Sequence, residues 1–177
     1  ANTATAAAGV KVVDATTATT VNFAGGITDD FDKVTDGTGI HADIGKIDGK
    51  DDDVNITVNG TVTGNADNVK AFNALGAATK GTVKATVSGE LAELDGLTKT
   101  ADLIADMELA ITVTNAATGS AGVASLNKIS AGTTGTVTVA SVSGKAAELA
   151  LLSESDTAAT GTQAYTIVVD DTATAAE

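Results

Sequence analysis

The residues best suited to chemistry in this chain are aspartates gathered between positions 29 and 53. Nine of the 17 aspartates fall in this segment, where glycines are interspersed among them. Ca²⁺ takes six to eight oxygen ligands from carboxylates, backbone carbonyls and water, often on bent loops. The segment therefore predicts a candidate calcium site, with Ca²⁺ as the one cofactor. Its candidate ligands are Asp29, Asp30, Asp32, Asp36, Asp48, Asp51, Asp52 and Asp53.

The same aspartates also fit an ordinary acidic loop exposed to solvent. Neither of their two clusters has the ligand spacing of an EF-hand. Residues 25–29, Gly-Gly-Ile-Thr-Asp, only begin like the calcium-binding nonapeptide Gly-Gly-x-Gly-x-Asp. The sequence leaves both interpretations open.

Catalytic sites are disfavoured by what the chain lacks. His41 is the only imidazole, and it lies in the polar segment 39–43 without a nucleophile motif nearby. One histidine and no cysteine disfavour a transition-metal site. Sugar clefts usually offer aromatic platforms, and the chain has no tryptophan and one tyrosine. No glycine-rich piece is followed by the Lys-Ser/Thr of a phosphate-binding loop. We therefore expect no catalytic residues and no enzyme.

The charge balance narrows the class of partner. The net charge is −13, all ten basic residues are lysine, and there is no arginine. Nucleic acid is an unsuitable partner because binding phosphates needs clustered positive charge. No stretch approaches the roughly 18 to 20 apolar residues of a transmembrane segment. Because 43% of the residues are hydrophobic, the chain is expected to fold rather than to form a disordered acidic tail.

Short stretches of the sequence recur at an interval of about 55 residues. The segment 87–94, Val-Ser-Gly-x-Leu-Ala-Glu-Leu, returns at 142–149, and Ile-Thr-Val at 56–58 returns at 111–113. A fixed internal period is typical of repeat architectures, in which each unit buries its apolar face only against its neighbours. The period favours a modular structural or binding protein over an enzyme with a single site.

Each period divides into two halves of roughly 27 residues that pair a strand with a short helix. Segments rich in Val, Ile and Thr predict strands near 54–58, 82–87, 109–113, 135–142 and 164–169. Between them, apolar residues at spacing i, i+3, i+6 predict helices of about two turns. These sets are Val69/Phe72/Leu75, Leu91/Leu94/Leu97, Val123/Leu126/Ile129 and Ala146/Leu149/Leu152. Such short helices must pack on the strands to be stable.

The expected fold is therefore α/β. Repetitive strand–short-helix units, joined by right-handed crossovers between parallel strands, would form a parallel-sheet, solenoid-like stack. An all-β sandwich, in which the helical segments are alanine-rich turns, is the alternative. We expect residues 1–53 to form an N-terminal strand plus an acidic Gly/Asp-rich lobe. Residues 54–177 would hold the strand/helix repeats.

Three short segments of the sequence resemble a known class of protein. Residues 135–139 (Gly-Thr-Val-Thr-Val), 142–149 and 171–177 resemble the Ala/Thr-rich repeat modules of large secreted bacterial surface proteins. These proteins are of the S-layer, RTX and adhesin type and are frequent in cyanobacteria. The resemblance covers residues 54–177 and implies an extracellular, cell-surface location and a structural role, often with calcium. Residues 94–98 also resemble repeats of phage fibre proteins.

The function expected from these observations is a non-enzymatic structural module of an extracellular surface assembly. An S-layer, a sheath or a filament would form by repeat stacking and by self-association into a homopolymer or lattice. A calcium-dependent adhesin-like binding module and a phage fibre repeat are the alternatives. Residues 2–7 resemble residues 171–176. We therefore expect excision from a longer array or head-to-tail polymerisation, with 1–13 or 164–177 in an intermolecular interface.

Overall fold

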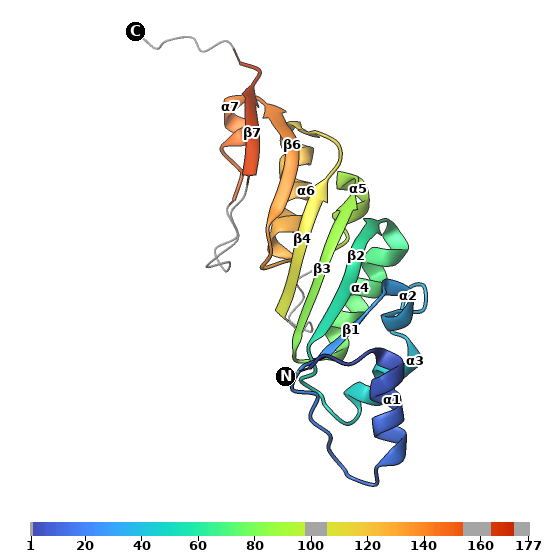
Figure 1. The fold of residues 1–177 in the computed structure, drawn as a ribbon. Helices are drawn as coiled ribbons and strands as arrows, with labels where there is room; N and C mark the ends of the chain where they lie inside the picture. Colours follow the sequence, from blue (N-terminus) through green and yellow to red (C-terminus); the bar gives the residue numbers. More distant parts are fainter. Residues whose placement is uncertain (1, 98–105, 154–163, 172–177) are drawn as a thin grey trace.

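A computed structural model describes residues 2–97, 106–153 and 164–171 of the chain. These residues form one sheet with helices packed on it, and every pairing between its strands is parallel (Figure 1). The α/β class predicted from the sequence is confirmed, and the all-β sandwich is wrong. The strands are β1 (Ile27–Asp29), β2 (Ile56–Gly64), β3 (Thr82–Gly89), β4 (Asp106–Val113), β5 (Ala117–Thr118), β6 (Val137–Gly144) and β7 (Ala164–Val169).

The strands cross the sheet in the order in which they occur in the chain. β1, β2, β3 and β4 are successive neighbours, and β4 pairs with the first half of β6. β5 pairs with the second half of β6, where Val142 lies between Ala117 on one side and Ile167 on the other. β4 and β5 therefore act as one interrupted strand on one side of β6. β7 lies on the other side of β6 and forms the edge of the sheet opposite to β1.

Long and short helices alternate along the body of the chain. The helices are α1 (Ala6–Ala15), α2 (Phe31–Val34), α3 (Ala42–Asp48), α4 (Ala66–Ala78), α5 (Leu91–Leu94), α6 (Gly119–Ala131) and α7 (Ala146–Leu149). α4 and α6 have 13 residues each, whereas α5 and α7 have 4 residues each. In Figure 1 all four lie behind the sheet.

The alternation follows from two different spacings. Neighbouring strands lie about 4.8 Å apart, whereas packed helices need about 8 to 10 Å between their axes. A full helix after every strand would therefore crowd one face of an open sheet. One long helix and one short helix for every two strands relieve the mismatch.

The core lies between the sheet and these helices, and the other face of the sheet is open. In β4, Leu109 and Ile111 are buried, whereas Glu108 and Thr112 are exposed. This alternation is the period of two that a strand with one covered face requires. On the helix side, Phe72 and the other predicted apolar residues of α4 and α6 are buried. The core is therefore a single layer.

The first residues of the chain differ from the expectation. The N-terminal strand predicted within 1–53 is replaced by α1, and only Ala4 makes a parallel bridge, to Ile27. The side chain of Thr5 accepts a hydrogen bond from the N–H of Ala8 at 3.2 Å, which caps the helix. Alanine, the best helix former, fills the turn that follows. The acidic segment also contributes β1, which pairs with Ile56–Val58 of β2 in the same sheet.

Two buried threonines join the ends of the long helices to the sheet. The hydroxyl of Thr79 donates to the carbonyl of Val54 at 2.7 Å. The hydroxyl of Thr133 accepts from the N–H of Leu109 and lies within 2.8 Å of the carbonyls of Met107 and Leu109. Each hydroxyl also accepts, at 2.9 Å, from the N–H of the glycine two residues later. The same polar joint thus fixes the helix-to-strand turn twice.

The glycines at these joints allow a close approach of two chain segments. A Cβ atom on Gly81 would lie 2.4 Å from the carbonyl oxygen of Asp53, and one on Gly135 would lie 2.2 Å from that of Leu109. No side chain tolerates such contacts with backbone. Glycine is therefore required where β3 and β6 begin.

Candidate functional site

The structure separates the eight candidate calcium ligands into two groups. Asp29, Asp30, Asp32 and Asp36 lie at or after the carboxyl end of β1, whereas residues 48–53 precede β2. Because β1 and β2 are parallel, these groups lie at opposite ends of the two strands. Within the described residues, no group of three or more His, Cys, Asp or Glu side chains is placed to hold a metal ion.

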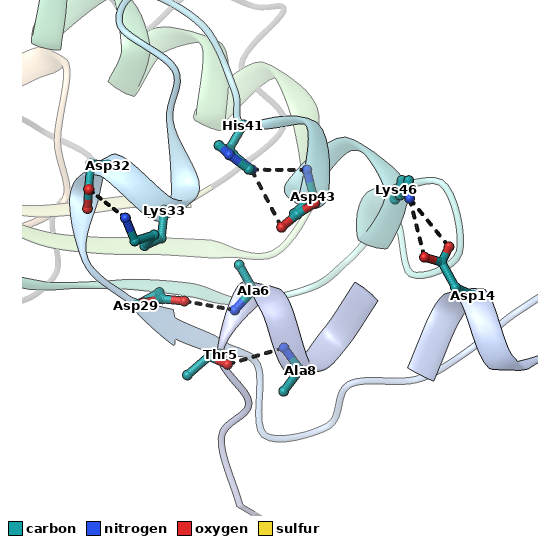
Figure 2. A network of polar contacts seen from close by, with 10 residues as sticks. All are labelled: Thr5, Ala6, Ala8, Asp14, Asp29, Asp32, Lys33, His41, Asp43 and Lys46. Carbon is teal, nitrogen blue, oxygen red and sulfur yellow. Dashed lines mark hydrogen bonds and ion pairs between the residues drawn. The ribbon is translucent and has the colours of Figure 1, made fainter. Parts of the chain in front are cut away.

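The carboxylates after β1 serve local structure. The two oxygens of Asp29 accept hydrogen bonds from the N–H groups of Ala6 and Asp30, each at 3.0 Å. Asp32 forms an ion pair with Lys33 at 2.7 Å (Figure 2). This hydrogen-bonded pair lowers the pKa of Asp32 and raises that of Lys33. Asp29 therefore closes the start of α1, and Asp32 belongs to an exposed pair of little energetic weight.

His41 also has a structural position. It is the N-cap residue of α3, and its Nδ1 accepts a hydrogen bond from the N–H of Asp43 at 3.2 Å (Figure 2). The Asp43 carboxylate lies 3.7 Å from the same nitrogen, which is beyond hydrogen-bond distance. The hydrogen bond from the N–H of Asp43 is therefore the contact within bonding distance. The ring thus closes the start of a helix.

The aspartates before β2 form a tighter cluster with unusual electrostatics. Asp51 is buried and accepts from the N–H of Phe23 at 2.5 Å. Burial raises the pKa of Asp51, and the hydrogen bond from Phe23 opposes this effect. Burial, together with the charge of Asp52, also raises the pKa of Asp48. The Oδ1 atom of Asp48 is buried, without a hydrogen-bond partner among the described residues.

This corner contains two lysines and a shallow hollow. Lys80, two residues after the end of α4, forms an ion pair with Asp52, whereas Lys50 donates a hydrogen bond to the carbonyl of Ala18 at 2.8 Å. A hollow of about 250 Å³ adjoins the cluster and is lined by Thr20, Val21, Asn22, Lys50, Asp51, Asp52 and Asp53. The cluster thus places several carboxylates near one another, with one ion pair to offset their repulsion.

The carboxyl ends of the strands carry a row of caps. Asn115 accepts a hydrogen bond from the first N–H of α5 at 2.8 Å, and Asp171 accepts from that of α7 at 2.9 Å. Both residues therefore act as caps of the short helices. Glu93 plays the same part for α4 at 2.8 Å, which sequence reasoning missed. The sequence offered one indication of this role, because Glu93 recurs as Glu148 in the repeated segment 142–149.

The open face of the sheet is polar and shallow. Lys84 of β3 and Glu108 of β4 form an ion pair at 2.7 Å across the two strands. A hollow of about 190 Å³ is lined by Thr57, Val58, Lys84, Ala85, Thr86 and Glu108. The two charged groups there are paired with each other.

The exposed large apolar side chains of the described residues lie at the two ends of the sheet. Val12 belongs to α1, which lies at the opposite end of the molecule from β7 (Figure 1). Leu151 follows α7, and Ile167, Val168 and Val169 belong to β7. Apolar residues exposed together usually mark a contact surface.

The part of the chain that the structure describes holds no helix with both the length and the hydropathy of a membrane span. Comparisons with protein-family models, with curated proteins and with solved structures find no match to this chain.

Proposed function

We propose that the chain is a non-enzymatic structural module of an extracellular surface assembly, such as an S-layer, a sheath or a filament. It would act by stacking strand–helix units and by associating with itself. The observation that carries the proposal is the chain-ordered parallel sheet, in which each strand–helix unit packs against its sequence neighbours. A sheet built in this way can grow by adding units at either edge.

Recurring details support the interpretation as a solenoid-like stack. β3 and β6 both end in a glycine, and a helix of 4 residues begins two positions later in each case. Two helices of 13 residues lead to the two buried threonine joints. These features recur at the interval of about 55 residues found in the sequence.

The polar groups also support a structural role. Asp29, His41, Glu93 and Asn115 each accept a hydrogen bond from a backbone N–H at or near the start of a helix. Such bonds satisfy donors that a helix leaves unpaired at its first turn. The extracellular location rests on the resemblance of residues 54–177 to secreted surface repeats.

Sedimentation velocity and electron microscopy across a wide range of protein concentration test the proposal. A structural module should form larger species as the concentration rises, and these should appear as filaments or sheets. A single monomeric species at every concentration would contradict it. The same sample at low concentration serves as the control for folding by circular dichroism.

A second candidate function is a calcium-dependent binding module of the adhesin type. The observation that favours it is the buried, unpaired Oδ1 of Asp48 beside Asp51 and Asp52, because a cation would offset the repulsion there. Titration calorimetry with Ca²⁺, with Mg²⁺ as the control ion, tests this candidate. Heat with Ca²⁺ that is absent in an Asp51→Asn variant supports it. Equal signals from both ions, or none, would leave only a solvated acidic corner.

A further inference from the structure

We propose that the outer edge of β7 receives the amino-terminal edge of a second copy of this chain. The two copies would lie head to tail, with their strands parallel. This inference rests on the proposed self-association and names the two surfaces that carry it. The carboxy-terminal surface comprises Leu151, Ile167 and Val169, and the amino-terminal surface comprises residues 2–4 and Val12.

The first observation is a step in burial at the last strand. On the face that the helices cover, Ile111 of β4 is 1% exposed and Val142 of β6 is 0% exposed. Ile167 pairs with Val142 in register and so points to the same face, yet it is 47% exposed. Val169, two residues further, is 54% exposed. Within the described residues, the carboxyl half of β7 therefore presents apolar side chains on the helix-covered face without the burial that Ile111 and Val142 have, whereas Tyr165 at its start is partly buried against the core.

The second observation is the open backbone of the two outer strands. Among the described strands, β7 pairs with β6 alone, so the N–H and C=O groups of its outer edge are free to join another strand. At the other end, Ala4 is bonded to β1 through the N–H of Thr28 at 2.8 Å and the carbonyl of Gly26 at 3.1 Å. The outer side of that segment has no neighbouring strand within the described chain.

The outer side of residues 2–4 and the outer side of β7 are complementary, because they are the two opposite edges of one parallel sheet. Inside the chain the same kind of joint is long; β3 and β4 are paired from Thr82 and Asp106 to Gly89 and Val113 without a shift. An added amino-terminal edge would therefore continue an established interface in the same polarity. This chain is thus a partner whose edge already has the geometry that β7 requires.

Charge points in the same direction. Asp170 and Asp171 directly follow β7, whereas Lys11 precedes Val12 on α1 and forms no ion pair within the described residues. The carboxy-terminal edge is thus acidic and the amino-terminal edge carries a free cation. Because the whole chain has a net charge of −13, two copies repel each other in most orientations. Contact at complementary ends is the arrangement that this charge distribution favours.

A contact between unlike surfaces does not close on itself unless the copies form a ring. Each added copy presents a new β7 edge, so open filaments result. Single substitutions can block one surface and leave the other intact. This property makes the inference testable by mixing.

The experiment uses Val12→Asp to block the amino-terminal surface and Val169→Asp to block the carboxy-terminal one. Both sites are exposed, so the variants should fold, which circular dichroism verifies. In sedimentation velocity each variant alone should stay monomeric, and an equimolar mixture should give dimers and nothing larger. Thr86→Asp, on the exposed face of the central β3, is the matched control and should assemble as the original chain does. Ile167→Thr replaces Val169→Asp if that variant does not fold.

Each other outcome overturns the inference. If either single variant still forms dimers alone, the interface is symmetric rather than head to tail. If all three variants assemble like the original chain, another surface carries the association, and the proposed function stands without this inference. If the original chain never assembles, the proposed structural function fails as well. If Thr86→Asp alone stops assembly, the open face of the sheet is the contact surface.

Discussion

Replacing Thr133 with valine tests how much a single buried hydroxyl contributes to this fold. Valine has nearly the same shape as threonine, so the substitution removes hydrogen bonds without leaving a large cavity. The hydroxyl accepts from two N–H groups, those of Leu109 at 2.8 Å and Gly135 at 2.9 Å. It also has one hydrogen, which it can donate to one of the two carbonyls beside it at a time.

The expected cost follows from the donors left unpaired. Each buried donor that loses its partner costs about 1 to 3 kcal/mol. Thr133→Val strands the buried N–H of Leu109 and the partly buried N–H of Gly135, and should lower the free energy of unfolding by about 2 to 4 kcal/mol. Thr79→Val strands one partly buried N–H, that of Gly81, and should cost less, about 1 kcal/mol. Thr133→Ser keeps the hydroxyl and loses a methyl group, which costs about 1 kcal/mol.

Urea unfolding followed by far-ultraviolet circular dichroism measures all three variants. The slope with denaturant should stay unchanged, because the surface exposed on unfolding is the same. Thr133→Ser should be more stable than Thr133→Val. Thr79→Val should be less stable than the original chain and more stable than Thr133→Val. If Thr133→Val is as stable as Thr133→Ser, the hydroxyl is not what holds the helix-to-strand turn, and the argument fails.

Three further predictions concern the core, the acidic corner and the net charge. Leu126→Ala should cost about 2 to 5 kcal/mol, as a fully buried leucine does, whereas Leu149→Ala, at a half-buried site, should cost about half as much in the same urea assay. The raised pKa of Asp48 means that its folded carboxyl contributes stability at low pH and loses it as the pH rises through that pKa. Asp48→Asn should therefore raise the unfolding midpoint at pH 7, and the gain should vanish below about pH 3. Added NaCl should promote self-association by screening the charge of −13, and light scattering that falls with salt would contradict this.

The sequence predicted the main elements because strong periodicity marks them. Strands near 54–58, 82–87, 109–113, 135–142 and 164–169 are all present, and the apolar sets of α4 and α6 are buried. Alternating Val and Thr in the strands and i, i+3, i+6 spacing in the helices leave little ambiguity. The parallel direction of the strands was predicted from the long connections between them, because antiparallel neighbours can be joined by short hairpin turns.

Other features were not predicted because their signals are short or nonlocal. β1 has 3 residues, too few to show a period. The joint made by Thr133 depends on contacts with Met107 and Leu109, which lie in a distant part of the sequence. The division of the aspartates between the two ends of β1 and β2 likewise depends on how the chain turns between them. The local composition showed that aspartates are dense in residues 29–53, but it could not show that the fold places them in two groups.

The ladders that join the strands also determine how the molecule would respond to a pulling force. Backbone hydrogen bonds in a sheet run across the strands, along the line from α1 to β7. Tension applied between those ends would load the ladders one after another, so the shortest ladder would yield first. β1 and β2 are paired over three positions, from Ile27 with Ile56 to Asp29 with Val58, whereas β3 and β4 are paired from Thr82 to Gly89. β6 is held on one side by three positions of β4 and two of β5, which together exceed the β1–β2 ladder. Under load such a module would lengthen in steps, with its amino-terminal end opening first and its centre holding.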